Sequence, residues 1–133
     1  MRVALVRHLG AVAALVLTLA PMQAQAFVSI WIDSSTFIYG RSIHSYASRA
    51  EADNDAGIDC LNKLRDAGYG PGSKHSCVSA VYSAKGCAAL AFNGNRWGSG
   101  SGATVQRAES KALERAQGGT VMVTVCDFAL TPP

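Results

Sequence analysis

The sequence predicts an α+β domain in which two repeated hairpin–helix–strand units share one core. We expect a mainly antiparallel sheet with two helices packed on it, stapled by disulfides. Two observations lead to this prediction. Strand-like and helical patterns follow one another in the same order twice, and Arg49-Ala50-Glu51-Ala52 is echoed by Arg107-Ala108-Glu109-Ser110. In addition, all cysteines lie after the apolar N-terminal segment.

The first unit opens with a predicted hairpin. Val28–Ile32 is rich in β-branched residues, Asp33–Thr36 has turn chemistry, and Phe37–Gly40 is the expected return strand. A loop over Tyr69–Ser73 and a strand over Ser76–Ser83 are expected to close the unit after its helix.

The first helix begins with a capping box. The hydroxyl of Ser48 can accept a hydrogen bond from the backbone N–H of Glu51, whose side chain can reach back. Gly68 is a natural C-terminal cap. One face of the helix is expected to carry Ala56, Cys60, Leu64 and Ala67.

The second unit repeats this order. Its predicted elements are strands over Cys87–Phe92 and Arg96–Gly100 joined by Asn93-Gly94-Asn95, a helix capped by Thr104, and a strand over Thr120–Cys126. Alternate glycines precede the second helix. They lack the lysine of a phosphate-binding loop and favour a bulged or flexible hairpin strand. Each unit alone would leave an apolar sheet face uncovered, so the two should share a core.

Residues 1–26 have the three regions of a cleavable secretory signal peptide. Arg2 and Arg7 supply positive charge, Leu9–Ala20 is apolar, and Ala24-Gln25-Ala26 is a small-residue cleavage site. The apolar run is shorter than the ~20 residues needed to span a bilayer. We therefore expect a single domain over residues 27–133, secreted or periplasmic, with no membrane span after signal cleavage.

The expected mature domain is nearly neutral. Arg2 and Arg7 belong to the leader, so 10 of the 12 basic residues remain, against 9 acidic residues. A nearly neutral domain has no electrostatic reason to bind nucleic acid.

The even number of cysteines in an exported domain predicts two disulfides. No C-x-x-C pair is present and the spacings are unlike those of structural zinc sites, so we expect no metal and no cofactor. Four cysteines allow three pairings. The cysteines are Cys60, Cys77, Cys87 and Cys126.

Catalytic groups are scarce in the expected mature chain. His44 and His75 fall in predicted loops, and no Gly-x-Ser-x-Gly elbow marks a nucleophile. The carboxylates crowd one helix, where they make a solvated face and not a cleft between two opposed carboxyls. This acidic group comprises Glu51, Asp53, Asp55 and Asp59.

Tyr46, Arg96 and Trp97 are a candidate interaction patch. Trp97 is followed by small residues that would cover little of its ring. Tyrosine, tryptophan and arginine are the residues that most often anchor interfaces.

Several short motifs are spread over about Ser29 to Phe128. They are Ser48-Arg49-Ala50-Glu51-Ala52, Cys60, Cys77, Gly86-Cys87-Ala88-Ala89-Leu90-Ala91, Arg107-Ala108-Glu109 with Ala112-Leu113, and Cys126. Together they resemble the bacterial domain of unknown function 4189 family. The resemblance implies an exported, cysteine-containing protein, and because no common activity comes with the family, it implies no catalytic residue.

The resemblance also implies a disulfide pairing. Members often carry a further cysteine pair, at places that hold Ala116-Gln117 and Val121 in this sequence. The joint absence of that pair implies that Cys60–Cys77 is the surviving copy of a repeated link. Cys87–Cys126 is then the second disulfide.

The functional hypothesis is a non-catalytic extracytoplasmic interaction module that binds or inhibits an unidentified protein or cell-envelope component. The alternative is a small secreted hydrolase using His44 or His75.

Overall fold

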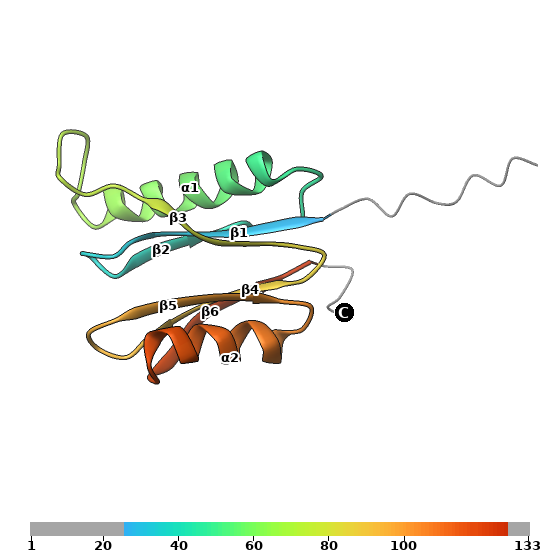
Figure 1. The fold of residues 1–133 in the computed structure, drawn as a ribbon. Helices are drawn as coiled ribbons and strands as arrows, with labels where there is room; N and C mark the ends of the chain where they lie inside the picture. The colour runs from blue at the N-terminus through green and yellow to red at the C-terminus, as the bar shows by residue number, and fades with distance from the viewer. Residues whose placement is uncertain (1–25, 128–133) are drawn as a thin grey trace, which may run out of the picture.

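A computed structural model describes residues 26–127, which form eight helices and strands (Figure 1). The predicted signal peptide therefore lies, except for Ala26, outside the described residues. The elements are β1 (Phe27–Asp33), β2 (Ile38–Arg41), α1 (Arg49–Asp66), β3 (Val78–Ala84), β4 (Cys87–Phe92), β5 (Trp97–Gly102), α2 (Val105–Ala116) and β6 (Thr120–Cys126).

The strands form two antiparallel three-stranded sheets, in the orders β2-β1-β3 and β5-β4-β6. Figure 1 shows four layers, with α1 outside the first sheet, the two sheets face to face, and α2 outside the second. The predicted α+β class with two helices and two hairpin–helix–strand units is confirmed. The strands divide between two sheets because each hairpin pairs with the strand that follows its own helix.

The two units also share a local irregularity. The pairing of β1 with β3 shifts register between Ile30 and Trp31. The pairing of β4 with β6 shifts between Leu90 and Ala91, at the same place in the equivalent strand. A β-bulge bends and twists a strand, so the two sheets carry the same kind of deformation at equivalent places.

The core between the sheets is built from alternate residues of the central strands. Val28, Ile30 and Ile32 of β1 meet Leu90 of β4 and Val125 of β6. The opposite face of β4 packs on α2, which is why this strand is buried on both faces. The small α2 side chains in that contact are Ala108, Ala112 and Ala116.

Glycines set the short distance between each helix and its sheet. A Cβ added at Gly98 would lie 2.2 Å from the backbone oxygen of Ala112, and one at Gly40 would lie 2.3 Å from that of Ala56. The glycine-rich run of β5 pairs with β4 without a register shift. The run is a hairpin strand as expected, but the interpretation as a bulged strand was wrong: the missing side chains make room for α2.

The predicted helix caps are present. The Ser48 hydroxyl accepts from the N–H of Glu51 at 3.3 Å, and the Thr104 hydroxyl accepts from the N–H of Arg107 at 3.2 Å. The second helix ends at Ala116, and its C-cap residue Gln117 adopts the left-handed conformation at φ 61°. Within residues 26–127, no helix is long and apolar enough to cross a membrane.

Two disulfides join Cys60 to Cys77 and Cys87 to Cys126, which confirms the expected pairing. The first ties α1 to the residue before β3. The second joins directly opposed residues of β4 and β6. Each disulfide therefore lies within one unit.

Candidate functional site: a basic cleft between two sheet edges

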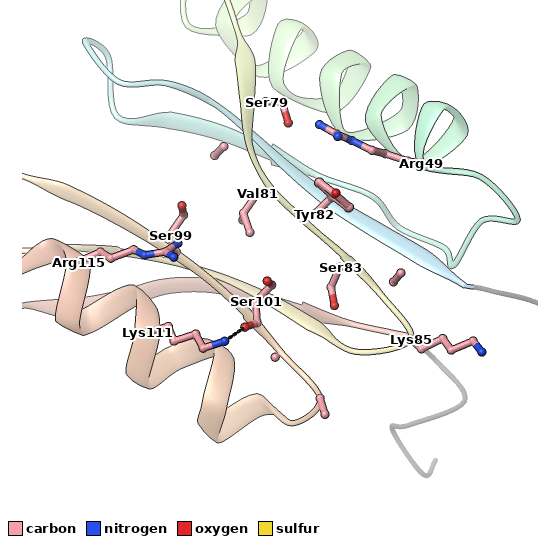
Figure 2. Close-up of a pocket in the computed structure, with 14 residues that line it drawn as sticks. Arg49, Ser79, Val81, Tyr82, Ser83, Lys85, Ser99, Ser101, Lys111 and Arg115 are labelled. Atoms are coloured by element: carbon pink, nitrogen blue, oxygen red, sulfur yellow. Dashed lines mark hydrogen bonds between the residues drawn. The ribbon is translucent and has the colours of Figure 1, made fainter.

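A cleft of about 710 Å³ lies between β3 and β5, the adjacent edge strands of the two sheets (Figure 2). Serines line both walls and basic side chains reach in from both helices. The polar lining residues are Arg49, Ser79, Tyr82, Ser83, Lys85, Ser99, Ser101, Lys111 and Arg115.

The β5 wall carries two cations from α2. The ammonium group of Lys111 donates a hydrogen bond to the backbone oxygen of Ser101 at 2.9 Å. The guanidinium group of Arg115 donates to the backbone oxygen of Ser99 at 2.8 Å. These single contacts leave both cationic groups with further donors, because Lys has three and Arg has five.

The β3 wall carries Arg49, which is held in place by a small polar cluster. Its guanidinium carbon lies 3.8 Å from the centre of the Tyr82 ring, and its Nε lies 3.1 Å from Asp53 Oδ2. Asp53 Oδ1 in turn accepts hydrogen bonds from Ser29 Oγ and Trp31 Nε1. This chain of contacts orients Arg49 along β3, although Asp53 offsets much of its charge.

Among the described residues that line the cleft there is no carboxylate. Five of the nine acidic residues lie instead on α1, and Figure 2 shows Lys85 at the far end, pointing outward. Residues 26–127, with 10 basic and 9 acidic residues, are nearly neutral and yet hold a basic cleft. This site was not predicted from the sequence, because the net charge of a chain does not show where in the fold its basic and acidic residues lie. The spacing of Lys111 and Arg115 could have indicated part of it, because two residues four apart lie on the same face of a helix.

The predicted patch of Tyr46, Arg96 and Trp97 is not brought together. Tyr46 pairs with Phe27 at the start of β1, whereas the Trp97 indole donates to the backbone oxygen of Ser34, just beyond the end of that strand. Seven strand residues, roughly 20 Å, separate the two sites.

Tyr46 lies near carboxylates of α1, whereas Trp97 lies among aromatic rings. Burial raises the pKa of the Tyr46 hydroxyl, and its hydrogen bond to Asp55 and the charge of Glu51 raise it further. Trp97 is half-buried, and its ring centre lies 4.5 Å from that of Phe92 and 5.9 Å from that of Phe37. Arg96 is exposed in the adjacent turn.

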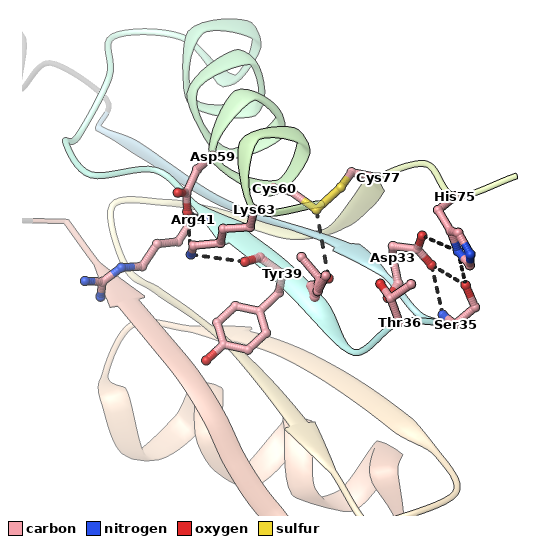
Figure 3. The surroundings of a disulfide bond; sticks show 11 residues. Asp33, Ser35, Thr36, Tyr39, Arg41, Asp59, Cys60, Lys63, His75 and Cys77 are labelled. Carbon is pink, nitrogen blue, oxygen red and sulfur yellow. Dashed lines mark hydrogen bonds and ion pairs between the residues drawn. A yellow bond between two sulfur atoms is a disulfide. The ribbon is translucent and has the colours of Figure 1, made fainter. Parts of the chain in front are cut away.

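His75 lies beside a serine and an aspartate, as Figure 3 shows. Its Nδ1 is 3.0 Å from Ser35 Oγ and 3.2 Å from Asp33 Oδ2. The Ser35 hydroxyl donates to Asp33 Oδ1 at 2.6 Å. A serine–histidine–aspartate triad uses the two ring nitrogens separately, one for the serine and one for the aspartate. Here one nitrogen faces both groups, so the arrangement is a turn-stabilising cluster and lacks the geometry of a proton relay.

The second histidine stands apart from this cluster. His44 is exposed, with its ring centre 6.3 Å from that of Tyr46 at the opposite end of β1. Among residues 26–127, no three histidine, cysteine or carboxylate side chains converge as metal ligands.

The Asp33 carboxylate predicts a pH dependence of stability. Its burial acts to raise its pKa, but hydrogen bonds from the Ser35 hydroxyl and backbone N–H and the charge of His75 outweigh this and lower it below 3.8. A depressed carboxyl pKa stabilises the fold above the unfolded-state pKa, and this contribution disappears as the pH falls through the folded-state pKa.

We expect Asp33→Asn to remove this acid-sensitive part of the stability. The wild type should lose more free energy of unfolding between about pH 6 and about pH 2.5 than the variant, as measured by urea unfolding. The asparagine oxygen can still accept from Ser35. Asp66→Asn, at an exposed position at the end of α1, is the matched control and should behave like the wild type. An Asp33→Asn variant with the full wild-type acid sensitivity would contradict the assignment.

Comparison with known proteins finds one solved structure with a similar fold and one matching family profile. The NMR structure of Rv1813c from Mycobacterium tuberculosis matches with a TM-score of 0.52 at 21% identity, covering 96% of this chain and 100% of that chain. At that identity the likeness shows the fold alone. A family profile described as a domain of unknown function (DUF4189) matches residues 27–126. The comparison with curated proteins gives no match.

Proposed function

Since the chain belongs to the domain of unknown function family DUF4189, whose name carries no activity, we propose its function from its own surface. It is an exported, non-catalytic binding module that holds an anionic protein or envelope component in the β3–β5 cleft. The observation that carries this proposal is the set of cationic side chains around a cleft whose lining contains no carboxylate.

The proposed extracytoplasmic location rests on chemistry in two parts of the chain. Disulfides persist in oxidising compartments, and both pairs here are formed. The N-terminal 26 residues have the charge, apolar run and small-residue site of a secretory leader.

Binding, and not bond cleavage, is what the cleft is suited to do. Its serines lie along the strands and have no histidine among the lining residues to accept a proton. Lys111 and Arg115 are held by hydrogen bonds to the β5 backbone, so they can meet an anion with little reorganisation.

We expect the double variant Lys111→Gln/Arg115→Gln to bind an anionic probe about tenfold more weakly than the wild type, because two exposed charge contacts are lost. The probe is poly-L-glutamate, titrated calorimetrically against residues 27–133 at low ionic strength. Added salt should weaken wild-type binding more than binding by the variant.

The matched control is Arg65→Gln/Lys74→Gln, which removes the same charge from exposed positions outside the cleft lining. It should bind like the wild type. If both double variants lose affinity equally, attraction is due to overall charge and the cleft is not the site. If the wild type does not bind the polymer at all, the proposed function fails for carboxylate ligands.

A further inference from the structure

The edges of the two sheets are not equally protected. An edge strand carries unpaired backbone N–H and C=O groups that can pair with another chain, unless side chains cover them. On β2, Asp59 accepts from the N–H of Arg41 at 3.0 Å, and Lys63 donates to the backbone oxygen of Tyr39 at 3.2 Å (Figure 3). Charged side chains of α1 thus occupy this edge.

The equivalent edge of the second sheet is covered in the same way. The β5 oxygens of Ser99 and Ser101 are occupied by Arg115 and Lys111 of α2. On β6, the Tyr39 hydroxyl donates to the backbone oxygen of Met122 at 3.1 Å. Within residues 26–127, the main chain of three of the four edges is therefore bonded by a side chain from a helix or from the other sheet. On β3, the side-chain bond to the main chain, from Ser29 Oγ to the oxygen of Val81, comes from its paired neighbour β1.

The outward groups of β3 can be identified from its neighbour β1. The backbone N–H and oxygen of Phe27 both bond to Tyr46, on the side away from β3. Ser29 likewise directs its oxygen to Ser42 N and its N–H to Ser42 Oγ.

Residues opposite such positions are non-hydrogen-bonded partners, so their own groups point away from the shared ladder. The partners of Phe27 and Ser29 on β3 are Ala84 and Tyr82. The N–H and C=O groups of Tyr82 and Ala84 therefore face the open edge. Within residues 26–127, neither residue has a hydrogen-bond partner on that side.

The open β3 edge lies in the basic cleft. A strand added to β3 would alternate its side chains between two faces. One face meets Arg49, whose guanidinium covers the Tyr82 ring. The other turns toward the second sheet, the side on which Figure 2 draws Lys111 and Arg115. The edge thus offers main-chain pairing together with charges suited to acidic side chains on alternate residues.

We infer that β3 binds an extended peptide segment with acidic side chains at alternate positions, which adds to the first sheet as a fourth strand. The inference rests on the proposed function and names its ligand. Charge complementarity selects an acidic segment over a second copy of this chain, because two copies of this edge would bring like charges together.

The test uses a capped synthetic hexapeptide of alternating threonine and glutamate, which is roughly 20 Å long when extended and comparable to β3. Its binding to residues 27–133 is followed by NMR. We expect amide hydrogen exchange at Tyr82 and Ala84 to slow by at least about tenfold on saturation, because both N–H groups gain partners.

Two matched comparisons isolate the main-chain contacts. A peptide with the same charges but N-methylated at the amides that face β3 should bind at least about tenfold more weakly, because it loses two or more hydrogen bonds. Ala84→Pro removes one outward N–H and should weaken binding about two- to tenfold, whereas Ala84→Val keeps that N–H and should not. If Ala84→Pro fails to fold, the comparison of the N-methylated and unmethylated peptides on the wild-type protein still tests whether the main chain of β3 binds the peptide.

The outcomes separate this inference from the proposed function. Equal binding of the methylated and unmethylated peptides would overturn strand addition and leave an anion-binding cleft. Slow exchange of the two amides that depends on protein concentration alone would overturn it in favour of a second copy. Absence of binding by both the hexapeptide and poly-L-glutamate would overturn both proposals.

Discussion

Gly98→Ala should destabilise the domain by about 3 kcal/mol or more. The new Cβ would lie 2.2 Å from both the backbone oxygen of Ala112 and the backbone nitrogen of Ala116. Backbone atoms inside a helix cannot swing aside as a side-chain tip can, so α2 must lift from β5. The lift would also open the packing of α2 on β4. Urea unfolding of the oxidised domain measures the loss.

The matched control for this substitution is Gly70→Ala. A Cβ at Gly70 would meet no atom within 4 Å, so this variant should retain wild-type stability to within about 0.5 kcal/mol. Gly40→Ala should resemble Gly98→Ala, because its Cβ would lie 2.2 Å from the backbone nitrogen of Cys60. If Gly98→Ala proved as stable as Gly70→Ala, the close packing of α2 on the sheet would be refuted.

Replacing Cys87 and Cys126 together by alanine should cost about 4 kcal/mol, because the disulfide closes a loop of 39 residues in the unfolded chain. The same replacement at Cys60 and Cys77, 17 residues apart, should cost about 3 kcal/mol. Either loss is a large share of the stability of a small domain. Chemical unfolding of the two double variants beside the wild type gives both values.

The second unit provides an internal reference for the Cys60–Cys77 variant. Gly40 meets Ala56 and Cys60, and Gly98 meets Ala112 and Ala116, so Ala116 stands where the first unit has Cys60. The second helix thus packs on its sheet with alanine at that place. We therefore expect the variant to keep the native fold at reduced stability. A greater loss for Cys60–Cys77 than for Cys87–Cys126 would contradict the loop-length argument.

Local sequence patterns identified the strands and helices to within one or two residues at most ends. The strand predicted over Val28–Ile32 extends over Phe27–Asp33, and the one predicted over Ser76–Ser83 runs over Val78–Ala84. The cap at Ser48 was recoverable because a capping box is set by residues three apart. The disulfide pairing came from the family resemblance and not from local pattern.

Contacts between distant segments were not recoverable in this way. Alternating apolar residues show that a strand is half-buried, but not which strand it joins, so one sheet was expected where two form. For the same reason Tyr46 and Trp97 were grouped although β1 separates them. The basic cleft forms only because β3 and β5 are neighbouring edge strands in the fold. The sequence of neither strand shows that the other will lie beside it.

Both ends of the described chain are hydrogen-bonded to Lys85 and Gly86, the two residues that link the first unit to the second. The N–H of Lys85 donates to the backbone oxygen of Ala26, and the N–H of Asp127 donates to that of Gly86, both at 2.9 Å. Within residues 26–127, that link is also the only covalent connection between the units, since each disulfide closes inside one of them. The order of the units along the gene is therefore not required by the fold. A circular permutant that joins Asp127 to Ala26 through a short linker and begins at Gly86 should assemble the same four layers.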